Sequence, residues 1–417
     1  MEQPTVHKVL DPRRVDVLDG IRALAVLIIM WFHIWQQSWL MPVFRLPFLA
    51  KLGLSPTISL DFIPRHGYIF VDLMLLISAF CLFLPHARAR LMGESLPSAW
   101  QFYKKRLVRI VPPYLLSIFI IMFAWALPAG AFPSIQKLCT DFFSSISFTQ
   151  TFFSTSLLDN RINGVLWTVV IEMQFYLIFP LLAYCFRKRP LISYAVMVGI
   201  ASAYIYGFAL RSPDTLRMSV NQLPAFFAVF ANGMLAAYIY VALSKRLQRR
   251  WWISLIATLL AVGFLLLIGR MEKSVGGTSP VQVWQLAHRF RLSLAFVGFI
   301  LSAALSAKWF RWLFSNKIMG FLAAISYNLY IWHQWIAVRF VEWRIPFWTG
   351  DTRPNVAGDT AWQWKYTLLV VMASLAAAAI VTYCFEKPIS KILLKNKRLV
   401  RSETKFITED THEDIPV

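Results

Sequence analysis

The chain has 417 residues, of which 58% are hydrophobic and only 15% charged, and its formal net charge is +21. Soluble domains are about half apolar and about a quarter charged, so this composition excludes a soluble enzyme. The basic residues stand in short clusters between apolar runs, which is typical of membrane orientation signals and argues against a nucleic-acid partner. The four cysteines form neither a disulfide framework nor a metal-ligand spacing.

Ten apolar runs approach the ~20 residues that cross a bilayer, which predicts an all-α polytopic membrane protein. In chain order they cover about 18–39, 68–85, 103–127, 164–186, 191–210, 223–243, 251–269, 290–307, 318–338 and 366–385. Ten crossings put the basic clusters on one side, so we expect both termini in the cytoplasm. The first run lacks a cleavage site after it and is interpreted as a retained anchor.

This reading divides the chain into three parts. Residues 1–17 form a cytoplasmic segment, residues 18–390 form the membrane domain, and residues 391–417 form a basic, then acidic cytoplasmic tail. The end of that tail is acidic and has few apolar groups, so we expect it to be disordered.

The first span carries three strongly polar side chains, Asp19, Arg22 and His33. A helix turns about 100° per residue, so the step from Arg22 to His33 returns to the same face within about 20° and rises roughly 16 Å. Ionisable groups inside a span usually face a cavity or a partner. We therefore predict that this face is the wall of a polar site, while Asp19 receives no role.

The later spans add polar residues at comparable depths. Counting from the span ends gives an inner layer near the cytoplasm and an outer layer, with Glu172 nearer the middle of the membrane. The inner layer comprises Arg22, Arg106, Arg109 and Glu386, and the outer layer comprises His33, Asp72 and His333. Two such layers predict a channel across the membrane.

The residue types favour acyl transfer to a hydroxyl group. Such a reaction needs a base, most often histidine near neutral pH, and a positive group for the charge that develops on the thioester oxygen. Acyl-CoA carries phosphates, which arginine binds well. We predict His33, Asp72 and Glu172 as catalytic residues and Arg22, Arg106 and Arg109 as the acyl-CoA-binding residues. Acyl-CoA is a co-substrate here, and we expect no bound cofactor or metal.

Several motifs recur along the chain. Asp19-Gly20 and Arg22 are followed by His33, and Arg106 and Arg109 form an Arg-x-x-Arg pair. The remaining motifs are Asp72 with Ser78-Ala79-Phe80, Leu166-Trp167-Thr168 through Glu172, Gln174, Phe175 and Tyr176, Ser326 through Tyr330 to His333, and Glu386-Lys387-Pro388.

This set of motifs resembles the acyltransferase-3 family of bacterial integral-membrane O-acyltransferases. The departures are Ala79 for a glycine, Thr168 for a serine and Lys387 for an arginine. The resemblance implies acyl-CoA-dependent acylation, acetylation above all, of a carbohydrate such as a cell-surface polysaccharide or its precursor. Within that site Trp167, Tyr176, Tyr330 and His333 are candidates for the acceptor wall, and Ser78 and Glu386 for structural roles.

Each site residue also has a structural alternative. Arg22 can extend to the lipid headgroups, and Arg106 and Arg109 can be orientation signals. His33 can be an interhelical hydrogen-bond donor, Asp72 can orient a histidine or pair with an arginine, and Glu172 can bridge two helices. His333 suits packing as well as a site wall.

A transporter or flippase for a glycolipid or exopolysaccharide is the alternative function. Transporters usually show repeat symmetry, which this sequence lacks, so the enzyme is favoured. The sequence leaves open the acyl group, the acceptor, the oligomeric state and whether His33 is the base or an orienting residue. With either function we expect the protein to contact membrane lipid.

Overall fold

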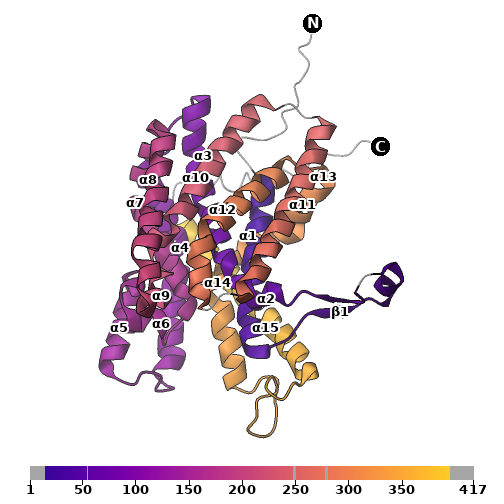
Figure 1. Ribbon diagram of the computed structural model, residues 1–417. Helices are drawn as coiled ribbons and strands as arrows, with labels where there is room; N and C mark the ends of the chain where they lie inside the picture. The colour runs from indigo at the N-terminus through magenta and orange to yellow at the C-terminus, as the bar shows by residue number, and fades with distance from the viewer. Residues whose placement is uncertain (1–14, 54, 248–249, 278–279, 395–417) are drawn as a thin grey trace.

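The computed structural model describes residues 15–53, 55–247, 250–277 and 280–394. Most of the predicted N-terminal segment 1–17 and of the predicted tail 391–417 lies outside these residues. Within them the chain is an all-α polytopic membrane protein, as the composition predicts (Figure 1).

Long helices make up the body of the protein, and they alternate in direction along the chain. They are α1 (Asp16–Ser38), α3 (Phe70–Met92), α4 (Ala99–Ile121), α7 (Trp167–Lys188), α8 (Pro190–Gly207), α10 (Leu223–Arg246), α11 (Trp251–Lys273), α12 (Val281–Leu305), α14 (Lys317–Glu342) and α15 (Thr360–Ile380).

Nine helical segments of the described part are long and apolar enough to cross a membrane. They coincide with nine of the predicted spans, and α14 corresponds to the remaining one, 318–338. The 26 residues of α14 extend about 39 Å, which is sufficient for a crossing. Its apolar run is interrupted by Asn328, His333 and Gln334, because this helix carries part of the polar site.

Shorter elements connect the long helices. The α-helical ones are α2 (Phe62–His66), α5 (Ile135–Ile146), α6 (Ser154–Leu158), α9 (Leu216–Ser219), α13 (Lys308–Ser315) and α16 (Lys387–Leu393). The 3-10 turns are η1 (Pro47–Leu52), η2 (Gly67–Ile69), η4 (Gln150–Phe152), η5 (Gly164–Leu166), η6 (Ala209–Arg211), η7 (Pro213–Thr215) and η8 (Ser274–Gly277). Two π-helical turns, η3 (Met122–Ala126) and η9 (Val381–Glu386), extend α4 and α15.

An antiparallel hairpin lies between α1 and α2. Its strands are β1 (Val43–Arg45) and β2 (Thr57–Ser59), with Phe44 opposite Ile58. The hairpin projects sideways from the helices, and its strand residues are exposed (Figure 1). It occupies the region that the sequence predicts as a loop between the first two spans.

Two helix boundaries differ from the prediction in ways that matter for the site. The predicted eighth span begins at residue 290, but α12 begins at Val281 and therefore includes Arg289. The third helix begins at Ala99, ahead of the predicted residue 103, because the Ser98 side chain caps it by accepting from the Gln101 amide at 3.5 Å.

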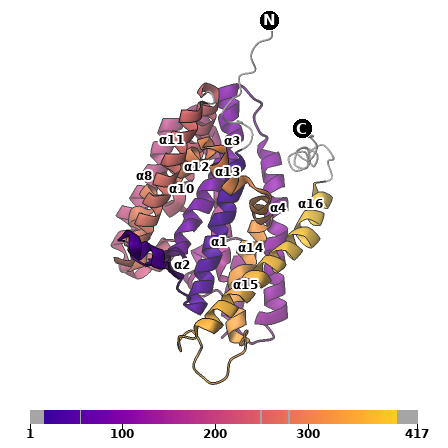
Figure 2. The ribbon, with the colours of Figure 1, turned by 90° about the vertical axis from the view of Figure 1, so that its right-hand side faces the viewer.

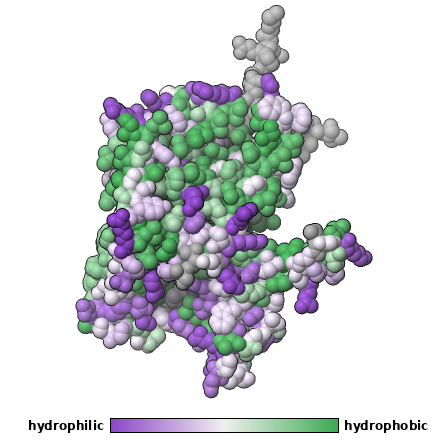
Figure 3. All heavy atoms as spheres, viewed as in Figure 1, coloured by the Kyte–Doolittle hydropathy of each residue, from purple (hydrophilic) through white to green (hydrophobic). Residues whose placement is uncertain are grey.

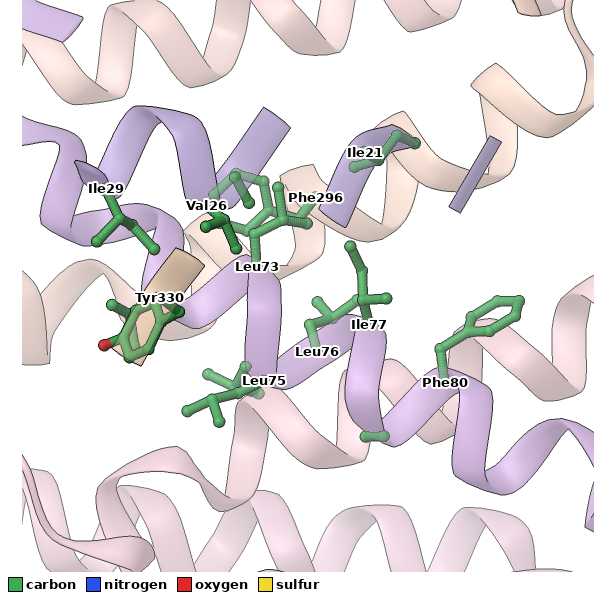
Figure 4. Packing of buried hydrophobic residues seen from close by; sticks show 14 of the residues in the cluster. Ile21, Val26, Ile29, Leu73, Leu75, Leu76, Ile77, Phe80, Phe296 and Tyr330 are labelled. Atoms are coloured by element: carbon green, nitrogen blue, oxygen red, sulfur yellow. The ribbon is translucent and has the colours of Figure 1, made fainter. Parts of the chain in front are cut away.

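Among the nine segments, α3, α10, α12 and α1 have the largest buried shares, and α14 is also largely buried over residues 323–341. Side chains from α1, α3, α12 and α14 interlock in this core (Figure 4). A Cβ atom at Gly233 of α10 would lie 2.3 Å from the Leu76 carbonyl oxygen of α3, and one at Gly20 of α1 would lie 1.9 Å from that of Phe314. Glycine at these positions therefore lets the helices approach closely.

The surface has the pattern of a membrane protein. Apolar side chains cover the middle and upper part of the face in Figure 3, between a polar upper rim and a polar lower region. Because the long helices alternate, α1 begins and α16 ends at the same end of the bundle (Figure 2). Basic pairs at the ends of α7 and α10, Arg187-Lys188 and Lys245-Arg246, lie at that end too.

Candidate active site

An inner cavity of about 90 Å³ lies among α1, α3, α4, α7 and α14. Helical spacing explains its composition: Ser78 and Cys81 on α3, and Glu172 and Tyr176 on α7, are three or four residues apart and share one face of their helix. Arg22 joins from α1, and its Nη2 is 2.8 Å from Asp19 Oδ1. The remaining polar residues of its wall include Arg106, Arg109, Thr168, Ser326, Tyr327 and Tyr330.

Glu172 connects two helices at this cavity. Its carboxylate accepts hydrogen bonds from Tyr176 on its own helix and from Ser78 on α3. The Arg106 guanidinium lies 6.0 Å from the centre of the Tyr176 ring. Glu386 is not part of this wall and accepts from Asn328 Nδ2 at 2.6 Å. The structural alternative for Glu172, a bridge between helices, therefore matches its contacts, and the residue also faces the cavity.

A second cavity of about 370 Å³ adjoins the inner one and shares Cys81 and Arg106 with it. Lys105, Arg187 and His86 supply further basic groups to its wall. The first turn of α4, at Ala99 and Gln101, also faces it. Phe102 and Tyr184 add aromatic rings. We call this the basic cavity.

The outer cavity, about 440 Å³, lies on the opposite side of the inner one. His33, Asp72, Trp167 and Arg289 line it, and Tyr330 lines both it and the inner cavity. Arg22 and His33 thus mark successive cavities along a single face of α1, as the spacing predicts.

His33, at the wall of the outer cavity, is paired with the buried His333. His33 Nδ1 and His333 Nε2 are 2.9 Å apart, and His333 Nδ1 lies 3.0 Å from the Leu329 carbonyl oxygen. Because a carbonyl only accepts, His333 Nδ1 carries the proton, and neutral His333 therefore accepts at Nε2. His33 then donates from Nδ1, which leaves the lone pair of its Nε2 free. This is the tautomer that a general base requires.

Asp72 pairs with Arg289 rather than with a histidine. Arg289 Nε lies 3.2 Å from Asp72 Oδ2, and both side chains are more than 90% buried. The guanidinium also donates to the Val220 carbonyl at 2.9 Å and lies 3.9 Å from the Phe226 ring centre. Of the alternatives for Asp72, pairing with an arginine is the one that the geometry shows.

Most of the predicted site residues line the inner cavity, the outer cavity or both. Arg22, Ser78, Arg106, Arg109, Glu172 and Tyr176 line the inner cavity, His33, Asp72 and Trp167 line the outer one, and Tyr330 lines both. His333, predicted as a wall residue, is fully buried behind His33 and lines neither cavity. Asp19 pairs with Arg22, and Glu386 lies behind the inner cavity.

Sequence reasoning missed several cavity residues. Arg289 was placed just outside a span, although a start at Val281 would have marked it as a buried charge. The sequence motifs also do not single out Lys105, Arg187 or His86, which line the basic cavity. Within the described residues no group of three His, Cys, Asp or Glu is placed to hold a metal ion.

Comparison with known proteins identifies the class. The profile of the family described as an acyltransferase domain, acyltransferase-3, matches residues 15–386. The chain therefore belongs to the acyltransferase-3 family and is a multi-pass membrane acyltransferase. This decides between the enzyme and the transporter that the sequence left as an alternative.

The chain is similar to several named relatives, three of which illustrate the range. It is 26% identical to a putative acetyltransferase, ORF330, of Acidianus two-tailed virus over 337 residues, 80% of this chain and 85% of the relative. It is 24% identical to the O-acetyltransferase OatA of Staphylococcus aureus over 368 residues, 82% of this chain but only 54% of that protein. It is 23% identical to nodulation protein 10 of Rhizobium leguminosarum bv. viciae over 258 residues, 57% of this chain and 65% of the relative. No solved structure matches the chain.

Proposed function

We propose that this enzyme transfers an acetyl group from cytoplasmic acetyl-CoA to a hydroxyl group of a carbohydrate acceptor on the other side of the membrane. The observation that carries the proposal is the meeting of two cavities at Tyr330, one lined by basic residues and one by His33. The acetyl group is supported by the names of two relatives, one a putative acetyltransferase and the other an O-acetyltransferase. The carbohydrate acceptor is supported by the family motifs, and a cell-surface polysaccharide or its precursor is the acceptor we favour.

The donor fits the basic and inner cavities. Lys105, Arg106 and Arg187 are suited to the phosphates of CoA, and the first turn of α4 adds backbone N–H groups and a favourable dipole. Phe102 or Tyr184 offers a ring face to adenine. The pantetheine arm then extends through the inner cavity toward Tyr330. The ~16 Å rise from Arg22 to His33 matches the length of such an arm.

The chemical step uses His33 at the outer cavity. Its free Nε2 removes the proton of the acceptor hydroxyl while that oxygen attacks the thioester carbonyl. Tyr330 lines both cavities. Its hydroxyl can donate a hydrogen bond to the thioester carbonyl oxygen as negative charge develops there. The carbon–sulfur bond breaks, the ester forms, and the CoA thiolate takes up the proton from His33.

The proposal also includes the orientation of the protein in the membrane. The basic helix ends lie at one end of the bundle together with the basic cavity, and the positive-inside rule assigns this end to the cytoplasm. We place the protein in the bacterial inner membrane with both termini in the cytoplasm.

Transfer of label tests the proposal. The purified protein, given [14C]acetyl-CoA and surface glycan from cells that express His33→Ala, should label the glycan, and His33→Ala itself should lose about 10²–10⁴-fold in rate. Arg106→Ala should raise the KM for acetyl-CoA far more than that for glycan, and Arg106→Lys should recover only part. Unlabelled glycan, or a His33→Ala variant that retains more than a tenth of the activity, would contradict the proposal.

A further inference from the structure

A fourth cavity of about 490 Å³ adjoins the outer one on the side away from Tyr330. The two share a wall made of Asp159, Asn160, Gly164 and Gln334. None of the predicted site residues lines this fourth cavity. Its far wall comes from η3 and the end of α14 and contains Trp125, Trp335, Val338, Arg339 and Glu342.

The loop in the shared wall is held firmly in place. Asp141, fully buried, accepts from the Arg161 amide at 2.9 Å and from Lys137 Nζ at 2.7 Å. Asn160 Oδ1 caps the next turn by accepting from the Ile162 and Asn163 amides. Asn163 Nδ2 in turn donates to the Ile331 carbonyl of α14 at 2.9 Å. The loop that lines both cavities is therefore held in one position by its hydrogen bonds.

Gln334 lies in the shared wall next to His333. No hydrogen bond from its amide to the described part of the chain is present, and its Oε1 lies over Gly164, 3.4 Å from where a Cβ would stand. Because the amide faces both cavities, it can donate to and accept from a ligand that passes between them.

The far wall combines aromatic rings with charged groups. The Arg339 guanidinium stacks 3.7 Å from the centre of the Trp125 ring, and its residue is 8% exposed. Trp335 packs edge to face against Trp125, with centroids 6.3 Å apart. Arg339 is paired with Glu342, so the wall presents hydrogen-bonding groups with little net charge. Flat apolar rings beside paired polar groups suit a ligand whose units have apolar ring faces and hydroxyl edges.

We infer that the fourth cavity is a second acceptor subsite, which binds the sugar next to the one that is acylated at His33. This inference rests on the proposed function and narrows its substrate class to an oligosaccharide or polysaccharide of at least two units. The helical rise from His333 to Arg339 is about 9 Å, so the two subsites lie one to two turns of α14 apart.

Acceptor length tests the inference. Acceptors of one to six units are prepared from the surface glycan of cells that express His33→Ala, and kcat/KM is measured with [14C]acetyl-CoA. For the wild type we expect kcat/KM to rise at least about tenfold between one and three units. Trp335→Ala should reduce the value for three units to nearly that for one, and leave the value for one unit unchanged.

Two further variants separate binding from folding. Val338→Trp removes no packing and fills the fourth cavity, so it should abolish the length dependence even if Trp335→Ala does not fold. Trp343→Ala is the matched control, because Trp343 contacts Trp335 with centroids 5.9 Å apart, is half exposed and lines neither acceptor cavity. It should behave as the wild type.

Three outcomes would overturn the inference. Equal kcat/KM for one and three units would show that a single sugar fills the site, and an equal loss for both lengths in Val338→Trp would remove the subsite. In the first of these cases the glycan fractions are still labelled, so the proposed function stands although the second subsite fails. If no fraction is labelled, the carbohydrate acceptor is wrong and the inference fails with it.

Discussion

The hydrogen bonds of His33 and His333 give the two residues different roles. The Leu329 carbonyl fixes the proton of His333 on Nδ1, and His333 then fixes that of His33 on its Nδ1. His33 Nε2 is thereby left as an acceptor, and His33 lines the outer cavity. In this account His33 is the base and His333 is a positioning residue.

The pair makes a specific prediction. His333→Ala removes the acceptor for His33 Nδ1–H, so kcat should fall at least about tenfold, yet less than the 10²–10⁴-fold expected for loss of the base itself. His333→Gln should recover much of this loss, because a side-chain amide can accept and donate as the imidazole does. Steady-state kinetics measure both, and the KM for acetyl-CoA should not change.

Equal losses in His333→Ala and His333→Gln, with KM values unchanged, would show that His333 takes part in proton transfer directly. A variant with wild-type kcat would make the contact between the rings incidental.

These residues show which side-chain arrangements of the site the sequence alone can predict. The common face of Arg22 and His33 was predictable, because both lie on one helix and the period of that helix fixes their directions. The contact between His33 and His333 spans 300 residues and depends on how α1 packs against α14. Side-chain spacing within one helix carries no information about such a contact.

At the scale of the elements, the ion pair of Asp72 and Arg289 joins α3 to α12. Its burial gives it a structural role, since a buried charge without its partner is costly. Asp72→Ala should therefore lower the free energy of unfolding by about 3–5 kcal/mol, and Arg289→Ala by a similar amount. The double variant should lose less than the sum, because it leaves no isolated charge.

Thermal unfolding of the detergent-solubilised variants measures this effect. The control is Gln282→Ala, a change on α12 that also faces the outer cavity but touches no ion pair. If Asp72→Ala unfolds at the wild-type temperature and has lost its kcat, Asp72 acts in the chemistry and the original catalytic assignment is correct.

The element boundaries explain why this pair was missed. The predicted eighth span starts at residue 290, so Arg289 falls just outside it, whereas α12 starts at Val281. Within the longer helix Arg289 is buried and pairs with Asp72. The other nine spans were recovered within a few residues at most ends, since long apolar runs specify their own helices.

At the scale of the whole molecule, four adjoining cavities form a series through the bundle. The basic cavity shares Arg106 with the inner cavity, the inner shares Tyr330 with the outer, and the outer shares Gln334 with the fourth. The predicted two polar layers correspond to the middle two of this series. The basic cavity and the fourth cavity could not be predicted, because their walls are assembled from loops and helix ends that are distant in the sequence.

The proposed function depends on this series of cavities, since it requires a donor on one side of the membrane to acylate an acceptor on the other. The phosphates of CoA cannot cross a hydrocarbon core unaided, whereas an acyl arm can reach Tyr330 through the inner cavity. The sidedness of the reaction therefore tests this requirement most directly.

The measurement uses sealed vesicles of both orientations, with acceptor glycan either trapped in the lumen or added outside. Inverted vesicles given external [14C]acetyl-CoA should label the trapped glycan, and the His33→Ala variant in the same vesicles should not. Right-side-out vesicles given the same external donor should leave external glycan unlabelled. Labelling confined to glycan on the same side as the donor would contradict a path through the bundle and with it the roles given to the four cavities.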